Sequence, residues 1–317
     1  MKKNILIRCD GSKDIGLGHV IRCLVLAKGF KKKGHSVYFA TRDYQIGIDK
    51  IKEEKFPVIL PYKNLNYNDW LLKIANNKAI DIFIGDVRDG LPPKTIKTLK
   101  KQGILTVAID EPSDYAKECD ICFYLPHANI DEKLYKGEVF QGFEYVILRD
   151  EFYGQYDKKK HDIPNILVMM GGTDAYNLTY KIVKQLIGLQ DKINIRVIID
   201  KKHSDYYKIK HIDKQVNVYS NVRNMADFLS EIDLGIITFG MSAYELLAMK
   251  IPSIHICLDE DHWIASGMFE KLGCAKRYNK DALYVKLDNI KFDTIKRNFF
   301  PKCFVEEKIL ERNLGGY

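Results

Sequence analysis

Short apolar runs rich in isoleucine and valine recur along the whole chain, and many of them end at glycine, aspartate or asparagine. Segments with apolar residues at helical spacing lie between these runs. Such alternation predicts repeated β-α units around parallel sheets, that is, an α/β fold. The expected strands are residues 4–8, 36–40, 80–85, 105–109 and 121–124 in the first half, and residues 165–170, 194–199, 216–219, 234–238 and 253–257 in the second.

The first helix is expected to begin near His19 and to end at Gly34, because apolar residues recur at helical spacing between them. Its start follows a glycine-rich turn. These apolar positions are Val20, Ile21, Leu24, Ala27 and Phe30.

The length of 317 residues suits two domains of about 150 residues each. A polar stretch at residues 153–164 contains three consecutive lysines and precedes a buried-strand run. We therefore predict two Rossmann-like parallel-sheet domains, residues 1–157 and 158–317, that face a cleft. Residues 293–314 are compatible with helices that pack back on the first domain. Ligands are expected beyond the carboxyl ends of the strands.

The formal net charge of +8 comes from lysines scattered over the whole chain, which is typical of solvated faces. A nucleic-acid binder would more often concentrate arginines and aromatic residues on one element, so no nucleic-acid partner is expected. Arg8 and Asp10 interrupt the first apolar run, which argues against a signal peptide or membrane insertion. A cytoplasmic protein is therefore predicted.

The seven cysteines are odd in number and mostly sit in apolar segments, as reduced cytosolic cysteines do. Cys119 and Cys122 form one C-x-x-C motif, but no second pair follows at metal-ligand spacing. Ile121 and Phe123 indicate a strand there instead. No metal and no cofactor are expected.

Residues 16–19, Gly-Leu-Gly-His, lie between the first strand and the first helix. Glycines let the backbone approach a ligand, and a helix N-terminus offers free N–H groups. The third glycine of a dinucleotide fingerprint is missing, which disfavours an oxidoreductase. His19 either caps the helix or acts as a general base, since the helix N-terminus disfavours its protonated form.

Two further turns in the second half suit a nucleotide. Residues 171–174, Gly-Gly-Thr-Asp, follow a strand and are either a phosphate-binding turn or simply a tight turn. Ser242 is expected to cap a helix at residues 243–249 and to offer its hydroxyl to phosphate. Glu245 lies three residues further on, where its carboxylate could accept both ribose hydroxyls or complete a capping box.

Residues 224–252, NMADFLSEIDLGIITFGMSAYELLAMKIP, resemble the nucleotide-binding half of GT-B enzymes such as the lipid II-forming N-acetylglucosaminyltransferase. The segments RCDGSKDIGLGHVIRCLVLAK, GFEYVILRDEF and MGGTD together resemble the UDP-sugar hydrolase of pseudaminic acid biosynthesis and its spore-coat polysaccharide relatives. This resemblance covers roughly residues 4–275 and implies a GT-B-like fold.

The resemblance also implies roles for individual residues. His19 would be the catalytic residue, activating water to displace UDP from the sugar C1. Residues on the sugar side would be Asp10, Gly18 and Arg22; those holding UDP would be Gly172, Thr173, Ser242 and Glu245, with residues 221–225 bordering uracil. The implied reaction hydrolyses a UDP-2,4-diacetamido-2,4,6-trideoxyhexose to UDP and the free sugar and requires no metal. The free sugar would be used to make a nonulosonic acid.

Two other functions remain open at this point. A glycosyltransferase on the same scaffold would use His19 to deprotonate a sugar hydroxyl in place of water. A protein that only senses UDP-sugars would retain Ser242 and Glu245 without needing His19. Residues 259–263, Asp-Glu-Asp-His-Trp, stand where relatives often have Asn-Gln, which leaves the identity of the sugar open.

Overall fold

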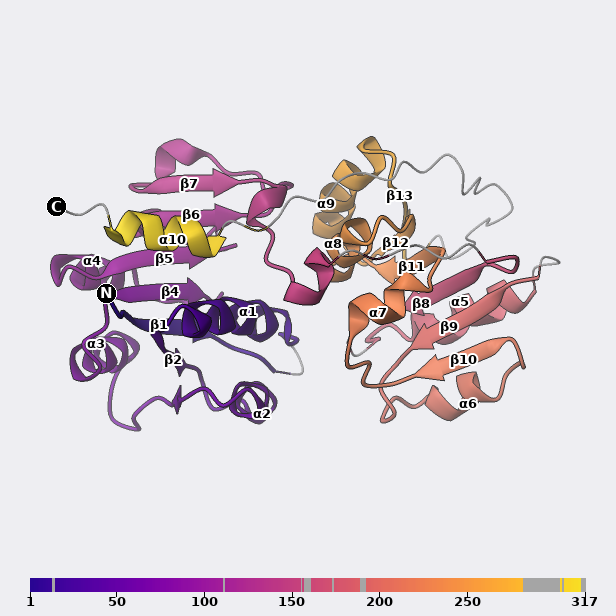
Figure 1. Cartoon of the computed structure of the whole chain (residues 1–317), viewed down its shortest axis with the longest axis horizontal. Coiled ribbons are helices and arrows are strands. Elements are labelled where there is room, and N and C mark those ends of the chain that lie inside the picture. Colours follow the sequence, from indigo (N-terminus) through magenta and orange to yellow (C-terminus); the bar gives the residue numbers. More distant parts are fainter. Residues whose placement is uncertain are drawn as a thin grey trace. The chain divides into compact units, whose positions relative to one another are not determined.

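The computed structural model describes residues 1–12, 15–110, 112–154, 156, 161–172, 174–188, 192–281, 303 and 305–314. It divides into two compact units: unit 1 comprises Met1–Arg149 and Pro301–Tyr317, and unit 2 comprises Asp150–Phe300. Each unit contains one parallel sheet with helices packed against it (Figure 1). The predicted α/β fold with two parallel-sheet domains is thus confirmed. The domain boundary predicted at residues 157 and 158 lies outside the described residues.

The sheet of unit 1 has the strand order β3-β2-β1-β4-β5-β6-β7, with all neighbours parallel. The order along the chain reverses between β1 and β4. In open α/β sheets such a reversal creates a crevice outside the carboxyl ends of the strands, where ligands bind. The strands are β1 (Asn4–Cys9), β2 (Ser36–Ala40), β3 (Val58–Ile59), β4 (Ile82–Asp86), β5 (Leu105–Ile109), β6 (Ile121–Tyr124) and β7 (Glu138–Gln141).

Helices cover both faces of this sheet because successive strand residues point to opposite sides. Ile5 and Ile7 belong to a core cluster with Phe30, whereas Leu6 packs in the other cluster with Trp70. The helices of unit 1 are α1 (Gly18–Lys32), α2 (Gln45–Glu53), α3 (Tyr67–Asn77), α4 (Pro93–Lys101) and α10 (Val305–Leu314), and its short 3-10 helices are η1 (Ala116–Glu118), η2 (Glu132–Leu134) and η3 (Phe143–Tyr145). Helix α10 contacts α1, and Figure 1 shows α10 in front of the sheet near β5.

The sheet of unit 2 has the parallel order β10-β9-β8-β11-β12-β13, so its reversal lies between β8 and β11. Its strands are β8 (Asn165–Met169), β9 (Asn194–Ile198), β10 (Val216–Tyr219), β11 (Leu234–Thr238), β12 (Ser253–Cys257) and β13 (Ala275–Asn279). Its helices are η4 (Asp150–Tyr153), α5 (Leu178–Ile187), α6 (Tyr206–Lys210), α7 (Met225–Ser230), α8 (Met241–Ala248) and α9 (Glu260–Lys271).

All ten strands predicted from the sequence are present, each beginning and ending within two residues of its expected bounds. Within the described part of the chain, three further strands, β3, β7 and β13, were not predicted. Each lies at an edge of its sheet. Their short or polar sequences lack the continuous apolar run that identifies a buried parallel strand.

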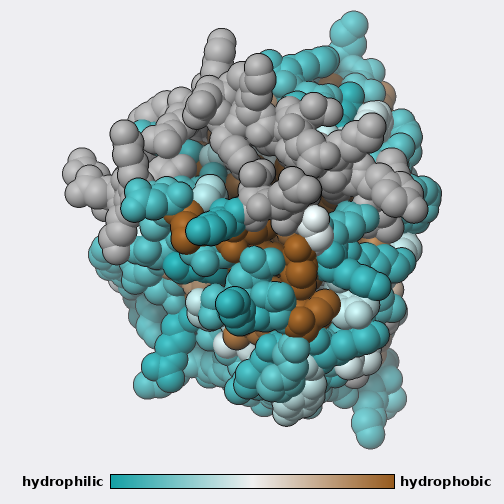
Figure 2. All heavy atoms as spheres, turned by 90° about the vertical axis from the view of Figure 1, so that its right-hand side faces the viewer, coloured by the Kyte–Doolittle hydropathy of each residue, from teal (hydrophilic) through white to brown (hydrophobic). Residues whose placement is uncertain are grey.

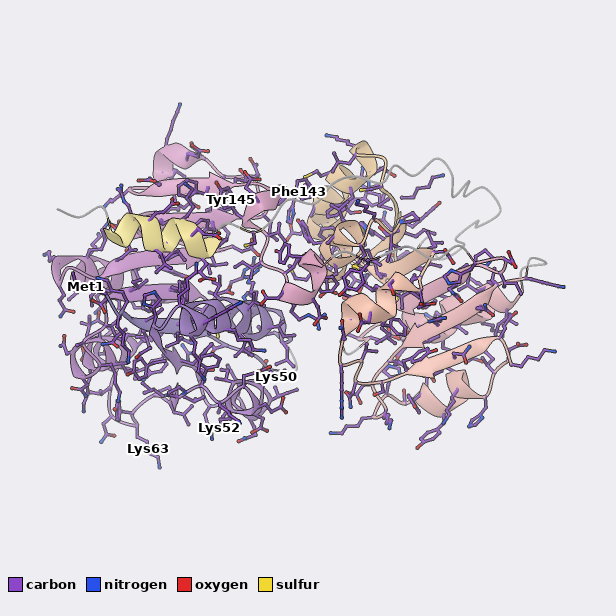
Figure 3. All side chains as sticks on the ribbon, in the orientation of Figure 1. Met1, Lys50, Lys52, Lys63, Phe143 and Tyr145 are labelled. Atoms are coloured by element: carbon purple, nitrogen blue, oxygen red, sulfur yellow. The ribbon has the colours of Figure 1, made fainter. Side chains whose placement is uncertain are left out.

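Basic side chains lie on several separate elements rather than on one. Figure 3 labels Lys50 and Lys52 on α2 and Lys63 after β3. The coloured part of the face in Figure 2 is mostly hydrophilic, with a few hydrophobic side chains near its centre. This distribution agrees with the scattered lysines of the sequence. No helix of the described residues is long and apolar enough to cross a membrane.

Candidate active site

His19 is the second residue of α1, the helix that follows β1. Gly16, in the preceding turn, has a φ of 78°, a left-handed conformation that favours glycine. Leu17 is the N-cap and makes no side-chain capping bond, so the alternative that His19 caps the helix is wrong. The His19 side chain is 21% exposed, which leaves part of its ring open to a ligand.

A buried carboxylate, Asp86, ends β4 and therefore lies across the strand reversal from the end of β1. The Nδ1 atom of His19 lies 2.6 Å from Asp86 Oδ1. Arg22, one helical turn after His19, donates from Nε to Asp86 Oδ2 at 2.6 Å and from Nη2 to Oδ1 at 2.5 Å. Its Nη1 donates to Asp110 Oδ2 at 2.9 Å. The structure thus brings His19 and Arg22 together, as one cluster with two carboxylates.

Asp86 is charged in this environment although it is almost fully buried. Burial by itself would raise its pKa, but the positive charge and hydrogen bonds of Arg22, together with His19, bring the pKa below its usual range. Asp86 was missed in the sequence. The sequence does offer a signal for it: Asp86 directly follows the apolar run at residues 80–85, and in a doubly wound fold this strand pairs with the first strand.

Asp10, predicted on the sugar side, is instead engaged by neighbouring protein groups. Arg8 donates to both of its carboxylate oxygens, at 2.6 and 2.7 Å. Thr41 Oγ1 and the backbone N–H of Arg42 donate to Oδ1 at 3.0 and 2.8 Å. With 4% of its surface exposed, Asp10 holds the connections after β1 and β2 together. Its contact with a sugar stays a prediction.

Arg8 itself is fully buried and extends this polar network toward Asp89, beyond the end of β4. Its Nε donates to the hydroxyl of Tyr67 at 2.8 Å, and that hydroxyl donates to Asp89 Oδ1 at 2.8 Å. Arg42 Nε also donates to Asp89, at 2.9 Å. A buried charge needs such pairing to be tolerated. Gly18, in contrast, is exposed at the first position of α1, and the space that a side chain would take there is open.

The first glycine turn of unit 2 lies at the carboxyl end of β8. Gly171 has a φ of 76°, and Gly172 is exposed with open space where a side chain would be. The following carboxylate, Asp174, accepts from the backbone N–H groups of Leu178 and Thr179 at 2.8 and 3.0 Å. Those N–H groups at the start of α5 are therefore occupied, and a phosphate here would have to use the turn itself. Thr173 lies outside the described residues.

The second turn of unit 2 leads from β11 into α8, on the other side of the strand reversal from β8. The N-cap of α8 is Gly240, and the helix begins at Met241. The predictions that Ser242 caps the helix and that the helix covers residues 243–249 are therefore wrong. The reason is that the extended backbone of Gly240 allows the helix to start earlier than the serine.

Ser242 is instead the second helical residue, and both it and Glu245 are partly buried. A capping-box glutamate occupies the third helical position, which here is Ala243, so this alternative for Glu245 is excluded. Ser242 and Glu245 are three residues apart on one helix, which places them on the same face.

Polar residues elsewhere in unit 2 are used for local structure. Asn224 caps α7 by accepting from the N–H of Asp227, and Met225 donates its N–H to Glu151. Asp259 caps α9 by accepting from the N–H of His262 at 2.8 Å. Among the residues that the structure describes, no group of three or more histidine, cysteine, aspartate or glutamate side chains is arranged to hold a metal ion.

Sequence comparison finds three curated relatives. An uncharacterized protein of Methanocaldococcus jannaschii is 30% identical over 275 residues, which cover 81% of this chain and 56% of that protein. The chain therefore spans about half the length of that relative. The spore coat polysaccharide biosynthesis protein SpsG of Bacillus subtilis is 24% identical over 282 residues, covering 85% of this chain and 81% of SpsG.

The third relative is the UDP-2,4-diacetamido-2,4,6-trideoxy-beta-L-altropyranose hydrolase of Campylobacter jejuni. It is 25% identical over 283 residues, which cover 84% of this chain and 97% of the hydrolase. No protein-family model matches the chain.

Among solved structures, the MurG protein of Acinetobacter baumannii has a TM-score of 0.73 at 13% identity, covering 98% of this chain and 99% of MurG. The spinosyn rhamnosyltransferase SpnG has a TM-score of 0.64 at 13% identity, covering 98% of this chain and 91% of SpnG. At such identities the likeness concerns the fold, which is that of GT-B glycosyltransferases. The resemblance predicted from the motifs is confirmed: the chain has a GT-B-like fold and is a homologue of SpsG and of the UDP-2,4-diacetamido-2,4,6-trideoxy-beta-L-altropyranose hydrolase.

Proposed function

We propose that the protein hydrolyses a UDP-2,4-diacetamido-2,4,6-trideoxyhexose to UDP and the free sugar, with His19 as the general base. The observation that carries the proposal is the partly exposed imidazole of His19 at the strand reversal of unit 1, held by a buried carboxylate. A ligand-accessible histidine at this place in the fold suits proton abstraction near neutral pH. The homology to a UDP-sugar hydrolase supports the choice of water as its substrate.

In this proposal the oxygen of water forms a bond to the sugar C1 while the bond from C1 to the UDP oxygen breaks. His19 takes one proton from the attacking water, the sugar keeps the new hydroxyl, and UDP departs with the bonding electron pair. No electron is gained or lost. The free sugar would then be available for a nonulosonic acid of the pseudaminic type.

Unit 2 would hold the UDP. Its two turns, at Gly171 and Gly172 and at the start of α8, follow the neighbouring strands β8 and β11. Backbone N–H groups of a glycine turn and of a helix N-terminus are a common way to bind phosphate oxygens. Glu245, on α8, would accept hydrogen bonds from the ribose hydroxyls, and Ser242 would donate to phosphate.

The test is incubation of the protein with a panel of UDP-2,4-diacetamido sugars in buffer without any acceptor. UDP and reducing sugar are measured separately, and hydrolysis releases them in equal amounts. Release of UDP only after a sugar acceptor is added would overturn the proposal in favour of a glycosyltransferase. Binding of the UDP-sugars without release of UDP under either condition would overturn it in favour of a binding protein.

The role of His19 is tested with His19→Ala. Loss of a general base lowers kcat by about 10²- to 10⁴-fold, whereas the Kd of UDP should change little because UDP is held by unit 2. His161→Ala is the matched control, since His161 Nδ1 also lies 2.9 Å from a carboxylate, Asp233, but at the amino end of the unit 2 sheet. Turnover by folded His19→Ala within a few-fold of wild type would rule out His19 as the base.

A further inference from the structure

The carboxylate of Asp86 has hydrogen-bond partners other than His19. Both oxygens accept from Arg22, Oδ1 also contacts His19 Nδ1, and the thiol of Cys23 lies 3.4 Å from Oδ2. Because Asp86 is ionised, its oxygens can only accept hydrogen bonds. Each neighbour therefore has to present a hydrogen to it.

This requirement decides where the imidazole proton of His19 lies. A separation of 2.6 Å between Nδ1 and a carboxylate oxygen is a hydrogen-bond distance, and it needs a proton between the two atoms. Arg22 Nη2 lies 3.1 Å from the same Nδ1, but arginine can only donate, and it has a shorter bond to Asp86 Oδ1. The close approach of Arg22 Nη2 and Nδ1 is then that of two donors sharing one acceptor. Neutral His19 therefore carries its proton on Nδ1 and its lone pair on Nε2.

Arg22 is itself fixed from a second side. Its Nη1 donates to Asp110, which follows β5 and has a φ of 50°, a left-handed conformation that aspartate tolerates better than most residues. The backbone N–H of Asp110 donates to the carbonyl oxygen of Phe123 on β6 at 2.7 Å. The orientation of Asp86 is thus held by α1 and by the connection after β5, not by β4 alone.

The contact with Asp86 also matters for the product of proton abstraction, because His19 Nδ1 lies 2.6 Å from its Oδ1. When His19 takes a proton on Nε2 it becomes an imidazolium, and its Nδ1–H then donates to the negative Asp86. A carboxylate in this position both fixes the tautomer of a histidine base and stabilises its protonated form.

We propose that Asp86 is a positioning residue for His19, clamped by Arg22, and that it makes Nε2 the atom that accepts the proton from water. This inference rests on the proposed hydrolase function for its catalytic meaning. It assigns Arg22, expected on the sugar side, a role that acts through Asp86. The inference requires His19 to carry its proton on Nδ1 already in the protein without substrate.

The first test is a nitrogen-15 NMR spectrum of histidine-labelled protein without ligand. The chain has eight histidines, so the His19 signals are assigned by their absence from the spectrum of His19→Gln. The proposal expects Nδ1 to be protonated and Nε2 to be unprotonated at a pH where His19 is neutral. A proton on Nε2, or an equal mixture of both tautomers, would overturn it. This arm uses no substrate, so failure of the hydrolase proposal does not affect it.

The second test is Asp86→Asn. An asparagine has only one acceptor oxygen, so one of the donors of His19 and Arg22 then faces an NH₂ group. We expect kcat to fall by about 10²- to 10⁴-fold with KM nearly unchanged, and the tautomer of His19 to become mixed or inverted. Asp120→Asn is the matched control. Asp120, just before β6, accepts hydrogen bonds from the backbone N–H and the hydroxyl of Thr106 on β5, and it does not contact His19, Arg22 or Asp86.

A folded Asp86→Asn protein with kcat within a few-fold of wild type would contradict the positioning role, and so would a fall that Asp120→Asn reproduces. If Asp86→Asn does not fold, the tautomer of the unmodified protein decides the proposal. The two proposals fail in different ways. An inactive wild type contradicts the hydrolase function, whereas a wild type that hydrolyses the UDP-sugar but carries its His19 proton on Nε2 contradicts only the inference on Asp86.

Discussion

His255 should make the stability of unit 2 fall in mildly acidic solution. This residue of β12 is fully buried, with Nε2 at 2.9 Å from Ser253 Oγ and Nδ1 at 2.8 Å from Ser266 Oγ. The rings of Phe239 and Phe269 lie against it. Because burial disfavours the charged form of the imidazole, the pKa of His255 is lowered to about 3.

The sign and size of the effect follow from proton linkage. The pKa of histidine in the unfolded chain is about 6.5, so below that pH the unfolded state binds a proton that the folded state does not. Stability from neutral His255 is complete above about pH 6.5 and is lost as the pH falls toward 3, at about 1.4 kcal/mol per pH unit. Between pH 7.5 and pH 5 the free energy of unfolding should therefore decrease by about 2 kcal/mol.

The assay is urea unfolding at several pH values, compared between the protein with His255 and the variant His255→Gln. Glutamine keeps a donor and an acceptor but does not titrate. The chain has two tryptophans, so a Trp70→Phe background leaves Trp263, on α9 of unit 2, as the only tryptophan reporter. Loss of packing in His255→Gln lowers stability at every pH, but it cancels when the changes with pH are compared.

The expected result is that the protein with His255 loses about 2 kcal/mol more than His255→Gln between pH 7.5 and pH 5. Carboxylates that titrate in this range contribute equally to both proteins when they are distant from the substitution. Parallel curves for the two proteins would refute the reasoning. They would mean that the folded state accepts a proton on His255 or opens locally to do so.

Three further variants test other parts of the structure. Glu245→Ala should raise KM with kcat nearly unchanged and weaken UDP binding in calorimetry, because a hydrogen bond to a charged group contributes about 1.5–3 kcal/mol; unchanged UDP affinity contradicts the ribose contact. Gly47→Ala places its methyl group 2.6 Å from the carbonyl oxygen of Gly11, so thermal unfolding should show a loss of about 1–3 kcal/mol, and an unchanged Tm contradicts this close contact. Ile309→Ala removes a fully buried side chain from unit 1 and should cost about 2–5 kcal/mol in urea unfolding followed through Trp70 in a Trp263→Phe background, with a cost below 1 kcal/mol as the contradicting result.

Much of the fold could be predicted from the sequence because its signals are local. Ten strands were predicted from their apolar runs, and the start of α1 was predicted from the glycine turn before His19. The edge strands β3, β7 and β13 were not predicted, because their sequences are short or polar, whereas the edge strand β10 was predicted from its sequence Val-Asn-Val-Tyr. Edge strands are defined by their pairing with a neighbour, which a run of residues does not show.

The candidate site was predictable only where one segment carries it. His19 is marked by its own turn, but Asp86 is 67 positions away along the chain and becomes its partner only because β1 and β4 pair in the sheet. The sugar contact of Asp10 stays a prediction, and its bonds to Arg8, which lies two positions earlier near the end of β1, are not visible in the sequence pattern. The cap of α8 was placed at Ser242 because serine favours that position, while the backbone of Gly240 decided the outcome.

The position of α10 at the end of the chain affects when unit 1 can finish folding during translation. Val305 and Ile309 are fully buried in the same core cluster as Phe30 of α1, although all of unit 2 lies between them in the sequence. During translation, domains generally fold as units beginning with the N-terminal one. Unit 1 cannot complete its core until the ribosome has passed through unit 2 and released α10, whereas unit 2 is a continuous segment. A premature stop codon just before residue 305 would therefore leave unit 1, which carries His19, with an incomplete core, whereas the segment that forms unit 2 would still be present in full.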